Sequence, residues 1–211
     1  MSQATYILLL LSLLLHSTTG STTDQPCPND MVLINDRLCI DRFEYPNKIG
    51  QKPLIAVSGI PEDGRPGYDA EGLCAAVGKR VATRKEWMTA CEGPEHFKYS
   101  YGNEYNPEAC NTEKLWRPVN PLKVAQRDPR HLHWLDQSEP NGSKDSCVSP
   151  VGAYDMVGNA EEWVKCDSGK YGWCLVGGFW ASGKQATCKY SITKHAPNWH
   201  YYNGFRCVKD I

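Results

Sequence analysis

The stretch "GAYDMVGNAEEWV", residues 152–164, is the most informative part of the chain. Carboxylate, amide and exposed main-chain oxygens are the hard ligands that Ca²⁺ prefers, and Asp155, Asn159 and Glu162 are its side-chain candidates. The spacing is not that of an EF-hand loop, and the same residues suit a turn capped by Asn159 with Trp163 as a core anchor. The residues alone leave both interpretations open and favour the turn.

The first twenty residues are typical of a secretory signal peptide, because an apolar run too short to span a bilayer precedes small residues suited to cleavage. We therefore expect a secreted or periplasmic protein, with residues 21–30 as an N-terminal extension and one domain over residues 31–211. No later segment predicts a membrane span. The net charge of −1 gives no electrostatic reason to expect a nucleic-acid partner.

Ten cysteines follow the signal segment, and an even count in an oxidising compartment predicts five disulfides. A zinc site is the alternative, but the chain has neither a C-x-x-C pair nor an H-E-x-x-H motif. Eighteen glycines and fourteen prolines indicate short elements joined by many turns.

Local signals predict a hairpin near the N-terminus. Residues 31–34 and 37–45 suit strands, and Asn35 and Asp36 between them suit a tight turn. Residues 99–150 are rich in Asn, Pro and Tyr, so we expect mostly irregular structure there.

Two helices are expected after the hairpin. Asp69 caps the segment AEGLCAAVG, which ends at Gly78. Thr83 and Glu86 form a capping box, in which each side chain reaches the main-chain amide of the other residue.

Several ordered motifs resemble the sulfatase-modifying factor family, to which the formylglycine-generating enzyme belongs. The motifs are "YDMVGNAEEWV" (154–164), "VGGFW" (176–180), "NGFRCV" (203–208), "GKRVATRKEWMTACEG" (78–93) and "YSYGNEYNPEACNT" (99–112). The resemblance implies a compact α+β domain with little regular structure, disulfide-rich and distantly similar to C-type lectins.

The resemblance also implies calcium sites and reverses the preference for a simple turn at residues 152–164. A second family site begins at the position of Asn111. The ligands that the resemblance implies for the first site, through carboxylates and main-chain carbonyls, are Asp155, Val157, Gly158, Ala160 and Glu162.

Two disulfides are implied by the family pattern, Cys74 with Cys207 and Cys91 with Cys188. The other three pairs are inferred from proximity along the chain. They are Cys27 with Cys39, Cys110 with Cys147, and Cys166 with Cys174.

The family's enzyme binds Cu(I) through two cysteines that follow its glycine motif, since copper(I) selects soft sulfur. The corresponding positions here hold Ser182 and Thr187, so the resemblance implies that this copper site is absent. Cys188 as a displaced copper ligand is the alternative, but it would leave Cys91 unpaired in an oxidising compartment.

The segment "KYSITKHAPNWHYYNGFRC", residues 189–207, combines aromatic and polar side chains that suit a pocket for a peptide, a carbohydrate or a small molecule. Alternatively, Trp199 and Tyr202 belong to the core. The family pattern implies that Arg206 is buried and structural. The candidate catalytic residues are Ser182, His195, His200 and Tyr201.

A separate motif, "HLHWLD", places His131 and His133 on one face of a possible strand near Asp136, where they suit a metal or simple solvation. Two functions stay open: a calcium-stabilised binding or structural module without copper, or an oxidoreductase of the same family that uses a non-thiolate site.

Overall fold

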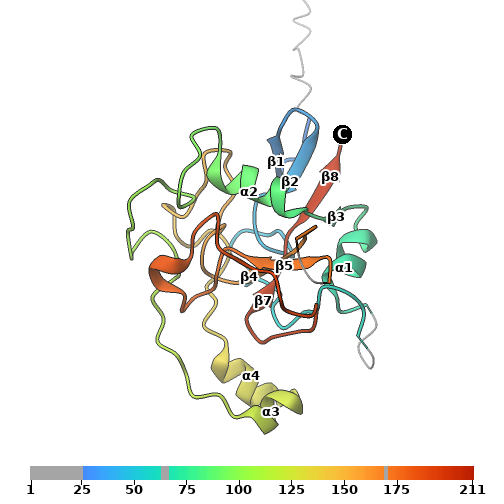
Figure 1. Ribbon diagram of the computed structural model, residues 1–211, viewed down its shortest axis with the longest axis vertical. Coiled ribbons are helices and arrows are strands. Elements are labelled where there is room, and N and C mark those ends of the chain that lie inside the picture. Colours follow the sequence, from blue (N-terminus) through green and yellow to red (C-terminus); the bar gives the residue numbers. More distant parts are fainter. Residues whose placement is uncertain (1–25, 63–66, 169–170) are drawn as a thin grey trace, which may run out of the picture.

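The computed structural model describes residues 26–62, 67–168 and 171–211 (Figure 1). The predicted signal peptide, residues 1–20, lies outside the described residues. Two small sheets, four short helices and long irregular segments make up the fold, as the many glycines and prolines predict.

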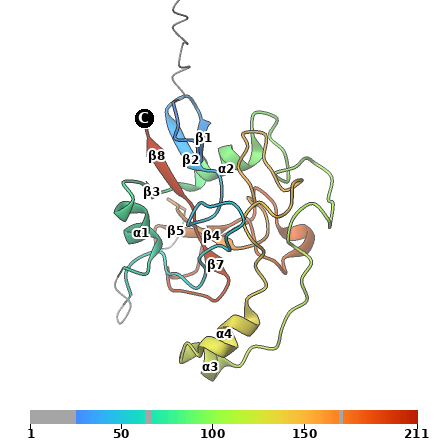
Figure 2. The same ribbon diagram turned by 180° about the vertical axis from the view of Figure 1, so that it is seen from behind.

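The first sheet joins the N-terminal hairpin to the C-terminal strand, so the two ends of the domain pair with each other (Figure 2). Asn35 and Asp36 have φ of 53° and 54°, the left-handed turn that the hairpin requires. The second strand ends at Asp41 and is shorter than predicted. In spatial order the strands are β1 (Met31–Ile34), β2 (Leu38–Asp41), β8 (Cys207–Asp210) and β3 (Arg80–Val81).

The second sheet contains the EEWV part of the opening motif. Side chains alternate on its central strand, so Glu162 faces Trp87 on one side, while Glu161 and Trp163 face the other. Its strands, in order, are β6 (Ser191–Ile192), β5 (Trp173–Val176), β4 (Glu161–Lys165) and β7 (Asn203–Gly204), with β4 and β7 parallel.

Helices α1 (Ala70–Ala76) and α2 (Arg84–Glu92) begin where their caps predict. The Asp69 carboxylate accepts a hydrogen bond from the Gly72 amide at 2.7 Å. Thr83 forms the predicted capping box with the third residue of α2. Helix α2 buries Trp87 completely.

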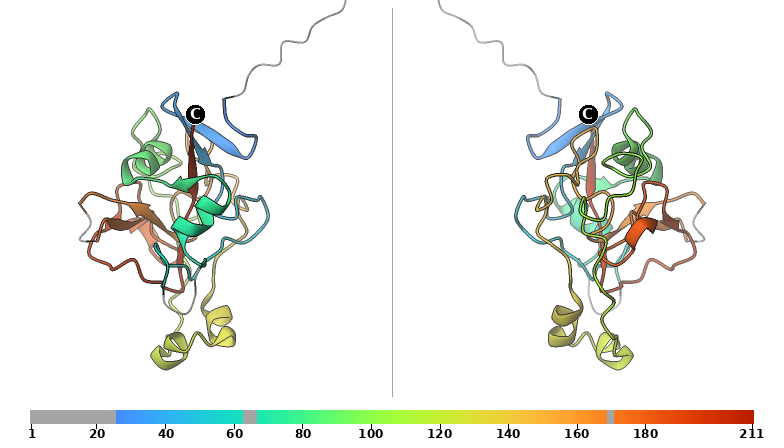
Figure 3. Two further views of the ribbon diagram at one scale, coloured as in Figure 1. Left: turned by 90° about the vertical axis from the view of Figure 1, so that its right-hand side faces the viewer. Right: turned by 90° about the vertical axis from the view of Figure 1, so that its left-hand side faces the viewer.

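The long segment between residues 99 and 150 is mostly irregular, and its two helices project away from the sheets (Figure 3). These helices are α3 (Pro121–Ala125) and α4 (Pro129–Leu135). The possible strand at "HLHWLD" is therefore wrong. Asp128 caps α4 and a proline occupies its first turn, which favours a helix over a strand. His131 and His133 then lie on different sides of the helix, and the Nε2 atom of His131 accepts from the Asn120 amide.

Five disulfides link the sheets, helices and loops, and their pairs are those expected from the sequence. All ten cysteines take part, so none is free. The pairs are Cys27–Cys39, Cys74–Cys207, Cys91–Cys188, Cys110–Cys147 and Cys166–Cys174. Five disulfides are typical of a protein of the secretory pathway. None of the helices in the described part of the chain is both long and apolar enough to cross a membrane.

Candidate ligand-binding site

The turn after the glycine pair uses its hydroxyl groups to hold the main chain. The Ser182 hydroxyl accepts from the Phe179 amide at 2.9 Å, and the Thr187 hydroxyl accepts from the Tyr190 amide at 3.1 Å. Cys188 is bonded to Cys91. This turn therefore offers hydrogen-bonded hydroxyls and a disulfide, and none of them is a soft thiolate ligand.

Five aromatic rings form a continuous series beside that turn, which we call the aromatic surface. Phe179 and Tyr202 stack with ring centroids 4.3 Å apart, and Trp116 packs edge-on against Phe179 at 5.2 Å. His200 stacks on the other side of Tyr202 at 5.6 Å, and His195 contacts His200 at 4.9 Å. Trp116 is 61% exposed, so the series ends at a ring that is open to a ligand.

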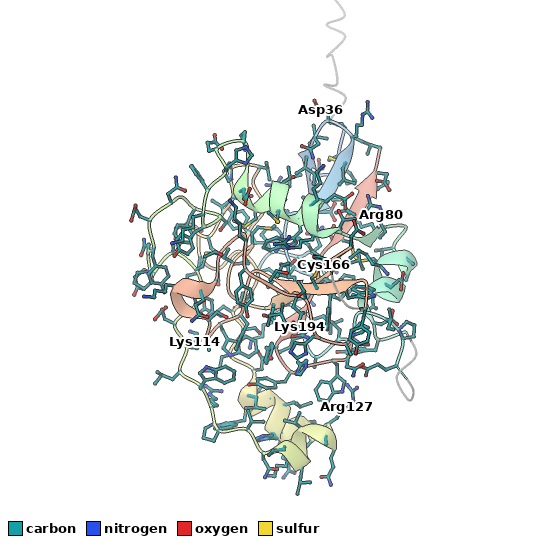
Figure 4. The ribbon with its side chains drawn as sticks, in the orientation of Figure 1. Asp36, Arg80, Lys114, Arg127, Cys166 and Lys194 are labelled. Carbon is teal, nitrogen blue, oxygen red and sulfur yellow. A yellow bond between two sulfur atoms is a disulfide. The ribbon has the colours of Figure 1, made fainter. Side chains whose placement is uncertain are left out.

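An open groove of about 520 Å³ adjoins the aromatic surface between the main body and α3. Arg127 lies beside the projecting helices (Figure 4). Its guanidinium lies over the Trp199 ring at 3.9 Å and pairs with Glu62 at 2.8 Å. Glu62 also accepts from the Trp199 amide at 2.8 Å. These contacts tie the projecting helices to the main body. The groove is lined by Glu62, Val124, Asn198, Trp199 and His200.

Two of the candidate catalytic side chains, His200 and Tyr201, are held in neutral states. Burial, with His195 nearby, lowers the pKa of His200, so its imidazole is uncharged at neutral pH. Burial raises the pKa of Tyr201, whose ring packs against Trp180. The structure brings His195 and His200 together, but the Ser182 hydroxyl is committed to its turn. This arrangement suits stacking and neutral hydrogen bonding better than proton transfer.

Sequence reasoning missed three contributors to the site. Trp116 and Phe179 lie outside the segment 189–207, and the tertiary fold brings them to it. Glu161 lies on β4 close to Tyr202, and its side chain is only 1% exposed. A cluster of aromatics around "GGFW" was the available signal for Phe179, whereas Trp116 and Glu161 carried none.

A family model described as the sulfatase-modifying factor enzyme 1-like domain matches residues 66–211. The chain belongs to this family. It is 31% identical over 98 residues to the formylglycine-generating enzyme of Bos taurus, covering 46% of this chain and 24% of that protein. It is 32% identical over 106 residues to the inactive C-alpha-formylglycine-generating enzyme 2 of Bos taurus, covering 46% and 29%. The matched part therefore spans less than a third of either relative.

Solved structures share the fold at low sequence identity. CarF superposes with a TM-score of 0.54 at 17% identity, covering 82% of this chain and 86% of that chain. PvdO from Pseudomonas aeruginosa gives 0.53 at 16%, covering 82% and 80%. The Major Tropism Determinant P3c variant gives 0.54 at 14%, covering 87% and 53%. The fold is thus that of the family, and it also resembles a C-type-lectin-like protein.

The two carboxylates that the family pattern implies as calcium ligands already accept hydrogen bonds within the chain. The Glu162 carboxylate accepts from Arg206 Nε and Nη2 and from Trp87 Nε1, so both its oxygens are occupied. One oxygen of Asp155 accepts from the Gly142 amide at 2.8 Å. Within residues 26–62, 67–168 and 171–211, no three His, Cys, Asp or Glu side chains are grouped to hold a metal.

The second implied calcium position is also engaged in hydrogen bonds. The Asn111 amide nitrogen donates to the Gln137 carbonyl at 3.1 Å and to Asn159 Oδ1 at 3.0 Å. Asn159 Oδ1 also accepts from the Glu139 amide. The Asn159 side chain therefore holds a turn through hydrogen bonds in this structure. The residues alone favoured that interpretation.

Proposed function

We propose that this chain is a secreted, non-catalytic member of the sulfatase-modifying factor family that binds a ligand on its aromatic surface. The observation that carries the proposal is the pairing of all ten cysteines, which leaves no thiolate pair to bind copper. The relationship to an inactive formylglycine-generating enzyme 2 supports the same conclusion.

The exposed apolar side chains support a binding role. Around the projecting helices, Leu115 is 84% exposed, Leu122 is 74% exposed and Trp134 is 44% exposed, close in sequence to the exposed Trp116. Such a concentration on one segment is typical of an interaction site. Aromatic rings with a few fixed polar groups suit a peptide, a carbohydrate or a small molecule with an apolar face.

The ligand-binding part is tested on peptide and glycan arrays with the secreted protein. We expect binding that falls at least tenfold in Trp116→Ala, because that ring is exposed and its removal leaves the core intact. Tyr171→Ala removes another exposed aromatic residue outside the aromatic surface and should bind normally. Equal binding by both variants would contradict a role for the aromatic surface.

The non-catalytic part has its own test. A thiol titration of the denatured protein should find no free thiols. Incubation with Cu(I), oxygen and a Cys-x-Pro-x-Arg peptide should produce no aldehyde. Aldehyde formation, or a bound redox metal in the purified protein, would instead favour an oxidoreductase with a non-thiolate site.

Calcium binding is a separate part of the proposal. Because Glu162 is occupied by Arg206, we propose that Asp155 and the main-chain carbonyl oxygens of Val157, Gly158 and Ala160 supply the ligands. Carboxylate and carbonyl oxygens are the donors that Ca²⁺ prefers.

A further inference from the structure

Two buried polar side chains on neighbouring strands are not satisfied by hydrogen bonds. Glu161 on β4 is the direct Cα partner of Asn203 on β7, so their side chains leave the same face of the sheet side by side. Glu161 is 1% exposed and Asn203 is fully buried. Neither polar atom of the Asn203 amide makes a hydrogen bond, and neither carboxylate oxygen of Glu161 has a donor within hydrogen-bonding distance, although the Tyr190 hydroxyl lies near the carboxylate. Native proteins rarely leave such groups unpaired, so this pair needs an explanation.

The charge of Glu161 is not neutralised by the protein itself. Among the described residues, no lysine or arginine forms an ion pair with Glu161, whereas Glu162 next to it is paired with Arg206. The Tyr190 hydroxyl lies near the carboxylate but carries no positive charge. A buried carboxylate in this state is satisfied by a proton or by a positive group from outside the chain.

Two tyrosines lie close to this carboxylate. The negative charge of Glu161 adds to the effect of burial in raising the pKa of Tyr202, to about 12, and it also raises the pKa of Tyr190. Both tyrosines are half-buried, and the Tyr202 ring belongs to the aromatic surface through its stacking on Phe179. The Glu161 carboxylate therefore lies close to one ring of the aromatic surface, that of Tyr202.

We propose that Glu161 and Asn203 form the floor of a subsite for an organic ammonium group on the ligand, with Tyr190 and Tyr202 as its aromatic walls. The inference rests on the proposed binding function and names the charge of the ligand. An ammonium donates N–H groups to the Glu161 carboxylate and to Asn203 Oδ1, and ring faces attract a cation. Calcium fits less well, because it takes six to eight oxygen ligands and this pair supplies one carboxylate.

The test uses n-butylammonium chloride as the probe and n-butanol as its neutral counterpart, at pH 8 and constant ionic strength. We expect the ammonium, and not the alcohol, to raise the melting temperature of the wild-type protein. Glu161→Gln, which keeps the shape and removes the charge, should abolish the rise. Glu104→Gln removes an exposed carboxylate and should respond as the wild type does.

Three results would overturn the inference: no rise in the wild type, an equal rise in Glu161→Gln, or a rise with CaCl₂ alone that Glu161→Gln abolishes. If Glu161→Gln does not fold, nuclear Overhauser contacts in the wild-type protein decide. Contacts between the butyl chain and the rings of Tyr190 and Tyr202 are expected, and their absence would contradict the subsite.

The inference and the proposed function can fail separately. Suppose that Trp116→Ala weakens binding on the arrays and Glu161→Gln leaves it unchanged. That result would support the aromatic surface as a binding site and exclude the ammonium subsite. An ammonium response that depends on Glu161, without any array binding, would retain the subsite and exclude the wider surface.

Discussion

Arg206 and Glu162 form a fully buried ion pair, in which the guanidinium Nη2 lies 2.7 Å from the carboxylate Oε1. Arg206 immediately precedes β8 and Glu162 lies on β4, so the pair connects the two sheets. Trp87 Nε1 donates to the same carboxylate at 2.8 Å and adds α2 to the junction. This junction holds the fold together and also explains why Glu162 is not available to a metal ion.

Removing one partner of this pair should be strongly destabilising, because it leaves the other charge buried and unpaired. We expect Arg206→Met and Glu162→Gln each to lower the free energy of unfolding by about 3–5 kcal/mol in urea denaturation. Arg80 is a matched control, since it pairs with Glu86 and Asp210 at the surface. Arg80→Met should cost about 1 kcal/mol or less, and equal costs at both sites would contradict the role of burial.

The stability of the protein should depend on pH through Glu161. Its pKa rises from 4.5 to about 7 in the folded state, so the folded state binds the proton more tightly than the unfolded chain does. The stabilisation by this group is complete below about pH 4.5 and is lost as the pH rises through about 7. Glu161→Gln cannot ionise and should gain up to about 3 kcal/mol relative to the wild type between those limits.

Urea denaturation of both proteins at pH 5 and pH 8, without amines, measures this difference. Burial also raises the pKa of Asp155, to about 6, and that of Glu44. Both groups are present in the two proteins, so their contributions to the difference in unfolding free energy largely cancel. A difference that stays constant with pH would show that Glu161 titrates normally.

The disulfides that close longer loops should stabilise the fold more, because the entropy lost by the unfolded chain grows with the logarithm of loop length. Cys91 and Cys188 are 97 residues apart, and Cys166 and Cys174 are 8 apart. In the chain-entropy model, replacing the first pair by alanines costs about 5 kcal/mol and replacing the second costs about 2–3 kcal/mol. Urea unfolding of the two double variants measures the two losses of stability. A larger loss on removing the short-loop disulfide would contradict the prediction.

Residues 141–143 read Asn-Gly-Ser, an acceptor motif for N-linked glycans. Asn141 should nevertheless carry no glycan in the folded protein. The Asn141 side chain is fully buried, and its amide nitrogen donates to the Glu44 carbonyl at 2.8 Å. A glycan on that nitrogen is incompatible with this packing. Protein secreted from eukaryotic cells should therefore show no mass change with a glycosidase for N-linked glycans, and a glycosylated folded protein would refute the arrangement.

Calcium should stabilise the protein if Asp155 helps to bind it. Adding CaCl₂ after EDTA treatment should raise the melting temperature, because an ion that binds only the folded state stabilises it by about 2.7 kcal/mol at a hundred times its dissociation constant. Asp155→Asn should lose the response, while Asp145→Asn, at an exposed position, should keep it. A melting curve that EDTA leaves unchanged would argue against calcium.

Much of the fold was predictable from short stretches of sequence. The hairpin depends on Asn35 and Asp36, which adopt left-handed conformations that few other residues tolerate. The helices depend on caps three residues from the amides they satisfy, such as Thr83 and Glu86. The prediction of a strand at His131 and His133 was wrong because Asp128 and the following proline start a helix there. This local signal outweighed the alternation of the two histidines.

The candidate site was only half predictable. The segment 189–207 supplied His195, His200 and Tyr202, because aromatic and polar side chains are concentrated there. Trp116 arrives from the long irregular segment through its contact with Phe179, and nothing periodic in that segment indicated the contact.

The sequence by itself determined the disulfide-rich class, the local turns and caps, and the family motifs, because these depend on residue types at fixed short spacings. Only the tertiary structure decided the different environments of the adjacent residues Glu161 and Glu162. Alternation on β4 turns Glu162 toward Arg206 and Glu161 toward Asn203, and these partners come from the far end of the chain. The Glu162 carboxylate is thereby neutralised by Arg206, while the Glu161 carboxylate is buried near Tyr202 without a positively charged partner.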